Sequence, residues 1–151
     1  MAEQATRPTP AGWPRMSSSL AYQDPVRAID WLVDAFGFSV RIKIPGAGGI
    51  QHSELTFGEG VVMVAGERSH GPTMARSPRS LNGATTQGIF IYVDDIESHY
   101  GRATAAGAVV VRELATTDYG PEYWSDRGYT VLDPEGHTWH FAQRLRSAAT
   151  P

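Results

Sequence analysis

The sequence contains no cysteine, and this absence removes several classes of chemistry together. It excludes disulfide bonds, thiolate nucleophiles and cysteine-ligated metal sites. Long apolar runs are lacking too, because no segment approaches the roughly 20 apolar residues that a membrane-spanning helix needs. Residues 1–15 also have no apolar run of the secretory type. We therefore expect a cytoplasmic protein without a membrane partner.

Excess charge of either sign is also missing. The formal net charge is -3 over 151 residues, so a basic surface that would attract nucleic acid is not expected. The chain is 41% hydrophobic and 19% charged, which is an ordinary globular composition, and its length suits one compact domain. The sequence therefore predicts a folded protein that does not bind nucleic acid.

The first half of the chain carries signals for a strand, a helix and three further strands. Asp24 and Pro25 are typical of a helix start, because Asp caps free amide groups and Pro fits the first helical position. Apolar residues at helical spacing follow, and Gly37 suits the left-handed position after a helix end. The predicted helix runs near 25–36, and the predicted strands cover 17–23, 38–44, 50–57 and 61–66.

The second half repeats this order of elements. Asp94 and Gly107 mark the start and the end of its helix, each 70 residues after Asp24 and Gly37. Past the third strand the offset between equivalent residues grows to 76. We interpret this as an internal duplication; the alternative is an unrepeated α+β sandwich with coincidental turns. The predicted helix runs near 95–106, and the predicted strands cover 87–93, 108–113, 128–132 and 138–143.

Prolines and small polar residues separate the repeated parts. They are frequent near the N-terminus and again between the two halves, where extended or loop structure is expected. The predicted organisation is an extended arm (1–15), a first module (16–66), a linker (67–86), a second module (87–143) and a tail (144–151).

The chain resembles the vicinal-oxygen-chelate superfamily of glyoxalases, bleomycin resistance proteins and dioxygenases, in particular its glyoxalase-like branch. The resemblance lies in the two tandem βαβββ units and in the local sequence of several segments. The segments are DPVRAIDWLVDAFGF, HSELTFGEGVVMV, VDDIESHYGRATAAGA and YTVLDPEGHTWHF. The resemblance implies an α+β fold in which two tandem βαβββ modules form a cupped mixed sheet, with helices on the convex side. Because this superfamily includes binding proteins and several kinds of enzyme, the fold does not decide the function.

The resemblance also implies where a metal would bind. In enzymes of the superfamily, four strand positions supply ligands to the cup, and they correspond to Ser17, Val64, Gln87 and His140. Catalytic zinc takes at least three protein ligands, from His, Asp, Glu or Cys. Only His140 is a strong ligand, so no cofactor is favoured. The alternative is one divalent ion, Zn, Ni, Fe or Mn, held by His140, Glu54, His52 and Gln87.

Strand alternation adds polar residues to the predicted cup. Side chains two positions apart share one face of a strand, which places His52 with Glu54 and Thr138 with His140. The predicted catalytic residues are Glu54 and His140, and the predicted ligand-binding residues on strands are His52, Gln87, Thr130 and Thr138.

Each of these residues also has a structural interpretation. His52 is alternatively a rim histidine hydrogen-bonded to the backbone, and His140 is alternatively a structural ring in a closed sheet. A carboxylate facing a helix-covered core is costly, so we expect Glu54 to face the cup or solvent. In the cup its pKa should be raised unless a cation lies nearby. His99 and His70 are expected on a helix surface and in the linker, without a functional role.

The second module carries six extra residues in the loop at 115–128. This loop includes Tyr123 and Trp124, which we predict as ligand-binding residues because aromatic rings at a cavity mouth stack on planar molecules. The alternative is that both rings pack as core residues at the end of the sheet.

The sequence thus favours a protein that binds a small organic molecule in the cup without a complete metal site. The alternative is a metal-assisted or acid/base lyase or isomerase of the glyoxalase type, since histidine and glutamate suit proton transfer beside a carbonyl. Whether the chain is an enzyme stays open. We expect a homodimer, because open sheet edges invite pairing with another chain.

Overall fold

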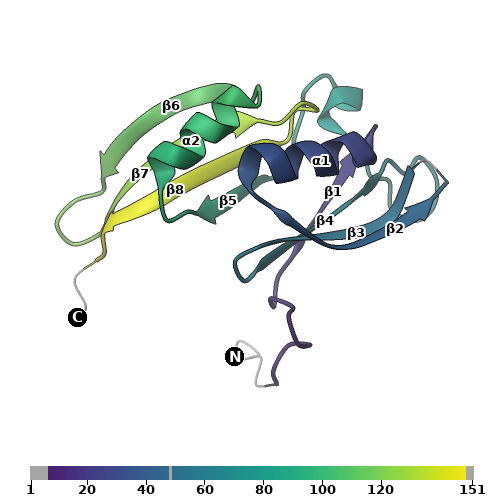
Figure 1. Cartoon of the computed structure of the whole chain (residues 1–151), viewed down its shortest axis with the longest axis horizontal. Coiled ribbons are helices and arrows are strands. Elements are labelled where there is room, and N and C mark those ends of the chain that lie inside the picture. Colours follow the sequence, from purple (N-terminus) through teal and green to yellow (C-terminus); the bar gives the residue numbers. More distant parts are fainter. Residues whose placement is uncertain (1–6, 48, 149–151) are drawn as a thin grey trace.

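The computed structural model describes residues 7–47 and 49–148, and these form eight strands, two α-helices and one short 3-10 helix (Figure 1). The predictions for 1–6 in the arm and 149–151 in the tail lie outside the described residues. The elements are β1 (Ser18–Tyr22), α1 (Pro25–Phe36), β2 (Ser39–Gly46), β3 (Gly49–Phe57), β4 (Gly60–Gly66), the 3-10 helix η1 (Pro78–Leu81), β5 (Gly88–Tyr92), α2 (Ile96–Ala105), β6 (Val109–Asp118), β7 (Ser125–Leu132) and β8 (Thr138–Arg146).

The strands form two four-stranded sheets with the same order. The first sheet runs β1-β4-β3-β2, and the second sheet runs β5-β8-β7-β6. In the first sheet β1 pairs with β4 in parallel, and in the second sheet β5 pairs with β8 in parallel. The other neighbouring strands are antiparallel. The predicted α+β fold with two βαβββ modules is therefore confirmed. Each module forms its own sheet, with β1 and β5 near the middle of the molecule and β2 and β6 at its outer ends (Figure 1).

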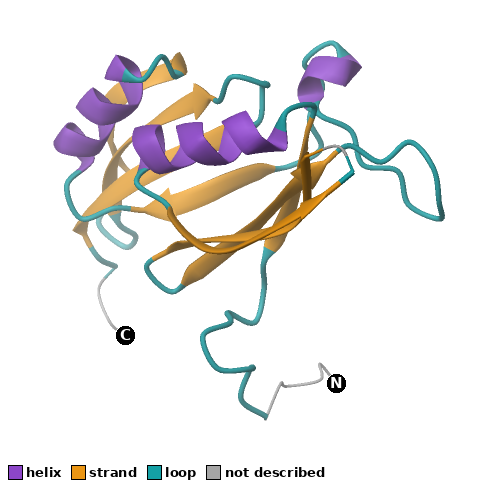
Figure 2. Ribbon diagram, turned by 45° about the vertical axis from the view of Figure 1, so that its right-hand side comes forward, coloured by secondary structure: helices purple, strands orange, loops and turns teal. Residues whose placement is uncertain are grey.

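Both helices cover the same side of the sheets, and the two modules share one core (Figure 2). Helix α1 begins where the Asp24 side chain accepts a hydrogen bond from Arg27 N at 3.0 Å, and it ends at Gly37 with φ of 83°. At the end of α1, the Phe36 ring lies 5.3 Å from the Trp139 ring of β8. Because the Phe36 and Trp139 rings are both fully buried, the two modules cannot separate without exposing apolar surface to water.

Strands β6, β7 and β8 are longer than predicted. The segment expected as a loop at 115–128 continues the β6–β7 hairpin, with Ala115 opposite Gly128 and Asp118 opposite Ser125. The β-branched threonines of this segment suit a strand, and Arg146 binds Asp118 at 2.7 Å across the hairpin tip. Strand β8 likewise runs to Arg146, into the segment expected as a tail.

A buried carboxylate in the β7–β8 turn, Asp133, ties the second module to the first. Its side chain accepts hydrogen bonds from Tyr22 Oη at 2.6 Å and from Trp139 Nε1 at 3.0 Å. Burial, and then the charge of Asp133, raise the pKa of Tyr22 well above its ordinary value. The phenol therefore stays protonated and keeps donating.

Two residues further on, Glu135 holds the junction of β1 and α1. Its carboxylate accepts from the backbone amides of Gln23 at 2.7 Å and Asp24 at 2.9 Å, and from Ser77 Oγ at 2.5 Å. These donors come from the first module and the linker. The DPEG turn thus joins three separate parts of the chain through two carboxylates.

The expectation that His99 lies on a helix surface without a role is wrong. Its Nε2 donates to the carbonyl oxygen of Phe36 at 3.0 Å, and its Nδ1 lies 2.6 Å from the Tyr129 hydroxyl. Burial lowers the pKa of His99, which keeps the ring neutral so that it can both donate and accept. His99 is a structural link between α1, α2 and β7.

Within the described residues, neither helix is long and apolar enough to cross a membrane.

We predict that Glu135→Gln lowers the free energy of unfolding by about 1–3 kcal/mol, because an amide nitrogen cannot accept and a buried donor is left without a partner. The matched control is Glu59→Gln, at the equivalent hairpin position of the first module, where the side chain is exposed. Thermal and urea unfolding measure both variants. Equal stability losses at the two positions would contradict the role given to Glu135.

Candidate functional site

The face of the first sheet opposite the helices carries a buried acidic residue, Glu54 on β3. Its neighbour Leu55 is fully buried in the core under α1, so alternation turns Glu54 to the other face. Glu54 is only 5% exposed. Its carboxylate accepts from Arg41 Nε at 2.7 Å and pairs with His52 Nε2 at 3.0 Å. The predicted pair of His52 and Glu54 is therefore brought together.

The charge state of Glu54 follows from these partners. The hydrogen bond with His52 is the largest influence on its pKa, and with Arg41 it lowers the pKa below 4.5 despite burial. The sequence predicted a raised pKa unless a cation lay nearby, and Arg41 is that cation. It was missed because the ladder between β2 and β3 shifts register between Val40 and Ile42. A simple alternation does not place a side chain at such a bulge.

The N-terminal arm lies against this same cluster. The guanidinium of Arg41 lies 4.6 Å from the centre of the Trp13 ring, and its Nη1 donates to the carbonyl oxygen of Gly12. The arm descends on the side of the sheets away from the helices (Figure 2). The Arg41, His52 and Glu54 side chains of the first sheet thus pair with one another, and the arm partly covers them, while Arg41 Nη2 is buried without a hydrogen-bond partner among the described residues.

The second sheet carries a different polar cluster on the corresponding face. His140 Nδ1 lies 3.0 Å from Thr130 Oγ1, which accepts from Arg112 Nε at 3.4 Å. The Thr130 hydroxyl can therefore donate to His140 Nδ1 while its oxygen accepts from Arg112, and in that tautomer the imidazole proton lies on Nε2. Burial, and then the charge of Arg112, lower the pKa of His140. The lowered pKa favours the neutral ring, and Nε2 is a donor in the tautomer whose Nδ1 accepts from Thr130.

A row of exposed rings extends from this cluster. Phe90 is 56% exposed, and its ring is 5.2 Å from that of Tyr92. The Arg144 guanidinium lies 4.9 Å from the Tyr92 ring and 5.2 Å from the Trp124 ring. Tyr123 and Trp124 are 54% and 36% exposed, so the interpretation of both as core residues is wrong.

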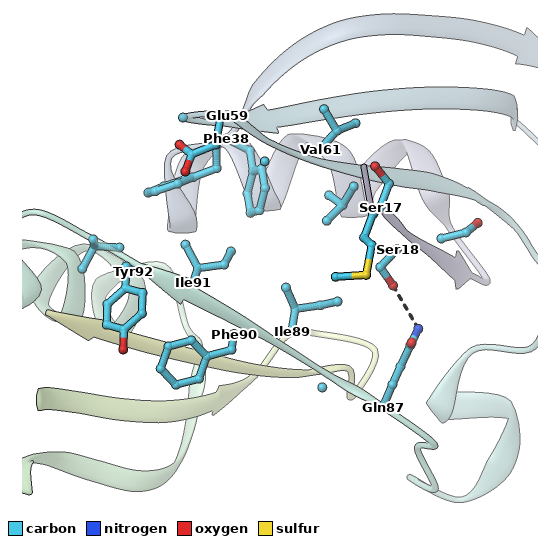
Figure 3. A pocket seen from close by; sticks show the side chains of 18 of the residues that line it. Ser17, Ser18, Phe38, Glu59, Val61, Gln87, Ile89, Phe90, Ile91 and Tyr92 are labelled. Carbon is cyan, nitrogen blue, oxygen red and sulfur yellow. Dashed lines mark hydrogen bonds between the residues drawn. The ribbon is translucent and has the colours of Figure 1, made fainter. Parts of the chain in front are cut away.

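A cleft of about 970 Å³ lies between the two sheets. Figure 3 shows that Phe90 and Tyr92 project from one side of β5 and that Ile89 and Ile91 project from the other. Across the cleft, Gln87 Nε2 donates to Ser18 Oγ at 3.0 Å. The predicted ligand-binding residue Gln87 therefore lines the cleft.

Thr138, the other predicted ligand-binding residue on β8, lies opposite Gly88 of β5. Its side chain shares a face of β8 with His140.

The comparison with protein families decides where the chain belongs. A model described as the Glyoxalase/Bleomycin resistance protein/Dioxygenase superfamily matches residues 16–141. The chain belongs to this superfamily. The match covers both modules and ends within β8.

Individual proteins and solved structures are similar to this chain over most of their length. TioX from Micromonospora sp. ML1 shares 38% identity with a TM-score of 0.68, covering 87% of this chain and 99% of TioX. The uncharacterised protein Mb0911c of Mycobacterium bovis is 34% identical over 137 residues, 88% of this chain and 85% of its own. TnmS3, an antibiotic binding protein from Streptomyces sp. CB03234, shares the fold at 20% identity, with a TM-score of 0.62 over 85% of this chain and 93% of its own.

One of the four strand positions that the resemblance implies as metal ligands carries a side chain that cannot bind a metal. Val64, at one of the four ligand positions, is fully buried in the core and has no donor atom. The described residues contain no group of three His, Asp or Glu side chains that could hold a metal ion. Glu54 and His140, which the alternative ligand set combines, lie on separate sheets.

Several residues of the second face were missed from the sequence. The strand Gly88–Tyr92 carries apolar or aromatic residues on both faces, so its sequence alone predicts a fully buried strand. Its parallel register with β8 places Phe90 beside His140, and only this pairing reveals which side of the strand is open. Arg112 and Arg144 carried no motif that would single them out.

We predict that Glu54 titrates below 4.5, as measured from its carboxyl carbon resonance, with Glu54→Gln used for assignment. His52→Ala should move the pKa of Glu54 upward, because it removes the largest lowering contribution. Since the folded state favours the charged carboxylate, the cluster stabilises the fold above 4.5, and this stabilisation is lost as the pH falls through the folded pKa. A pKa of Glu54 at or above that value would contradict the pairing.

Proposed function

We propose that this protein binds a small organic molecule at the second sheet and the adjoining cleft, and that it does so without a metal ion. The observation that carries the proposal is the pair of exposed rings, Phe90 and Tyr92, that line a cleft of about 970 Å³, with Trp124 connected to Tyr92 through Arg144. Exposed aromatic side chains gathered beside a concavity are typical of ligand sites.

A solved structure with the same fold offers a precedent for binding a small molecule. TnmS3, which shares the fold, is described as an antibiotic binding protein. The donor set of this chain adds support, because only His140 among the four inherited positions is a strong metal ligand. We therefore favour sequestration of a ligand over metal-dependent chemistry.

The test is a thermal-shift screen of protein treated with EDTA, using a library of aromatic and aliphatic compounds. A compound present at 100 times its Kd stabilises the fold by about 2.7 kcal/mol, which raises the Tm by several degrees. Phe90→Ala should reduce the shift, whereas Leu81→Ala, an exposed residue of η1, should not. Absence of any stabilising compound, or loss of binding on removal of metal, would contradict the proposal.

The alternative is an acid/base lyase or isomerase of the glyoxalase type. The observation in its favour is Glu54, a carboxylate almost without exposure and paired with His52 at 3.0 Å. An ionised Glu54 would accept a proton beside a carbonyl group, with His140 as the second predicted catalytic residue. Conversion of a screened compound into a product, abolished by Glu54→Gln, would favour this alternative over simple binding.

We further propose that the protein is a homodimer. The outer strands β2 and β6 carry exposed apolar side chains, which are costly in water unless a partner covers them. These side chains are Val40, Ile42, Ile44, Val109 and Val111. A second copy of the chain is the simplest partner, because it presents the same surfaces.

Light scattering at micromolar concentration should give about twice the 16.4 kDa chain mass. Ile42→Glu should shift the mass toward the monomer, because it places a charge in the proposed contact. Val26→Glu, an exposed apolar position on α1, is the control and should leave the mass unchanged. A monomer mass for the unaltered protein would contradict the proposal.

A further inference from the structure

We propose that the second sheet recognises a planar aromatic ring bearing a carboxylate. The ring would stack beside Phe90 and Tyr92, and the carboxylate oxygens would accept hydrogen bonds from Arg112 and His140. This inference rests on the proposed function and names the class of molecule that the site would take.

The aromatic half of the site is open and already ordered. Phe90 and His140 have nearly parallel rings, 6.4 Å apart and inclined by 24°. Phe90 and Tyr92 stand edge to face at 5.2 Å, so the two rings present differently oriented surfaces to one ligand. Flat molecules gain most from such a surface, because offset-stacked and edge-to-face contacts are both available.

The anionic half depends on Arg112. Among the described residues, Arg112 makes no ion pair, whereas Arg144 on the same face is bound to Asp126 at 2.5 Å. Arg112 is exposed and uses only its Nε, toward Thr130. The remaining guanidinium N–H groups are suited to the paired oxygens of a carboxylate.

His140 supplies a second donor through its hydrogen bond with Thr130. Where the Thr130 hydroxyl donates to His140 Nδ1, the imidazole proton lies on Nε2 and is available to a ligand. Gly88 keeps this nitrogen accessible, because a Cβ atom there would lie 2.9 Å from His140 Nε2. The site therefore offers N–H donors near the aromatic surface.

The charge on this face favours an anion over a cation. Asp126 is buried and already bound by Arg144 and Tyr92, so it offers no free carboxylate to a cationic ligand. The two arginines outnumber this one acid. A cation would meet the unpaired charge of Arg112, whereas an anion would neutralise it.

Three small probes separate the two halves of the proposal, with binding measured by calorimetry or by NMR titration. They are 2-naphthoate, its neutral analogue 2-naphthamide, and cyclohexanecarboxylate, which keeps the charge without the aromatic ring. We expect 2-naphthoate to bind at least tenfold more tightly than either of the others, since a charged hydrogen bond and a stacking contact are each worth roughly that factor.

Variants assign the effect to residues. Arg112→Gln should weaken 2-naphthoate binding about tenfold while leaving 2-naphthamide unchanged, and Phe90→Ala should weaken both. The matched control is Arg127→Gln on β7, a residue of the same sheet whose side chain pairs with Glu97 of α2 at 2.6 Å. This control should leave the affinity for 2-naphthoate unchanged.

Equal binding of the carboxylate and the amide, or equal loss in Arg112→Gln and Arg127→Gln, would overturn the inference while leaving small-molecule binding intact. Failure of all three probes would also overturn it. Only a simultaneous failure of the broader compound screen would overturn the proposed function itself.

Discussion

The two carboxylates of the β7–β8 turn are the interaction on which the arrangement of the modules depends. Asp133 and Glu135 are 3% and 6% exposed, and their partners lie on β1, on the start of α1 and in the linker. A buried carboxylate is tolerable only when donors surround it. The donors on β1, at the start of α1 and in the linker reach the two carboxylates only when the second module docks on the first. Docking of the modules therefore supplies the hydrogen bonds that these buried carboxylates need.

This docking leaves the far faces of the two sheets open, and they are not equivalent. On the first sheet, Glu54 pairs with Arg41 and with His52, and the Trp13 ring of the arm lies against the Arg41 guanidinium. On the second sheet, Arg112 is free of acidic partners among the described residues, and Phe90 is uncovered. The two modules share a fold, but the charged groups on the open face of the first sheet pair with one another, whereas Arg112 on the second sheet has no acidic partner among the described residues.

The parts of this structure that depend on local sequence could be predicted. The bounds of α1 follow from Asp24, Pro25 and Gly37, and strand alternation places Glu54 with His52 opposite the buried Leu55. The repeat offsets predicted the topology of the second module from the first. All of these depend on neighbours in the chain, or on a second copy of the same pattern.

The remaining parts depend on contacts between distant residues. The bulge that turns Arg41 toward Glu54, the parallel register that sets Phe90 beside His140, and the reach of Arg144 between Tyr92 and Trp124 have no local signature. His99 also has no local signature. Its position on the helix predicts an exposed side chain, but in the structure the rings of Phe36, Tyr129 and Phe141 lie against it.

Ligand binding at the second sheet, rather than the first, is tested most directly by amide chemical-shift mapping during titration with 2-naphthoate, because this experiment reports both sheets at once. Perturbations should be concentrated at Gly88–Tyr92, Thr130 and His140, with little change around His52 and Glu54. Perturbations centred on His52 and Glu54, with β5 and β8 silent, would contradict binding at the second sheet.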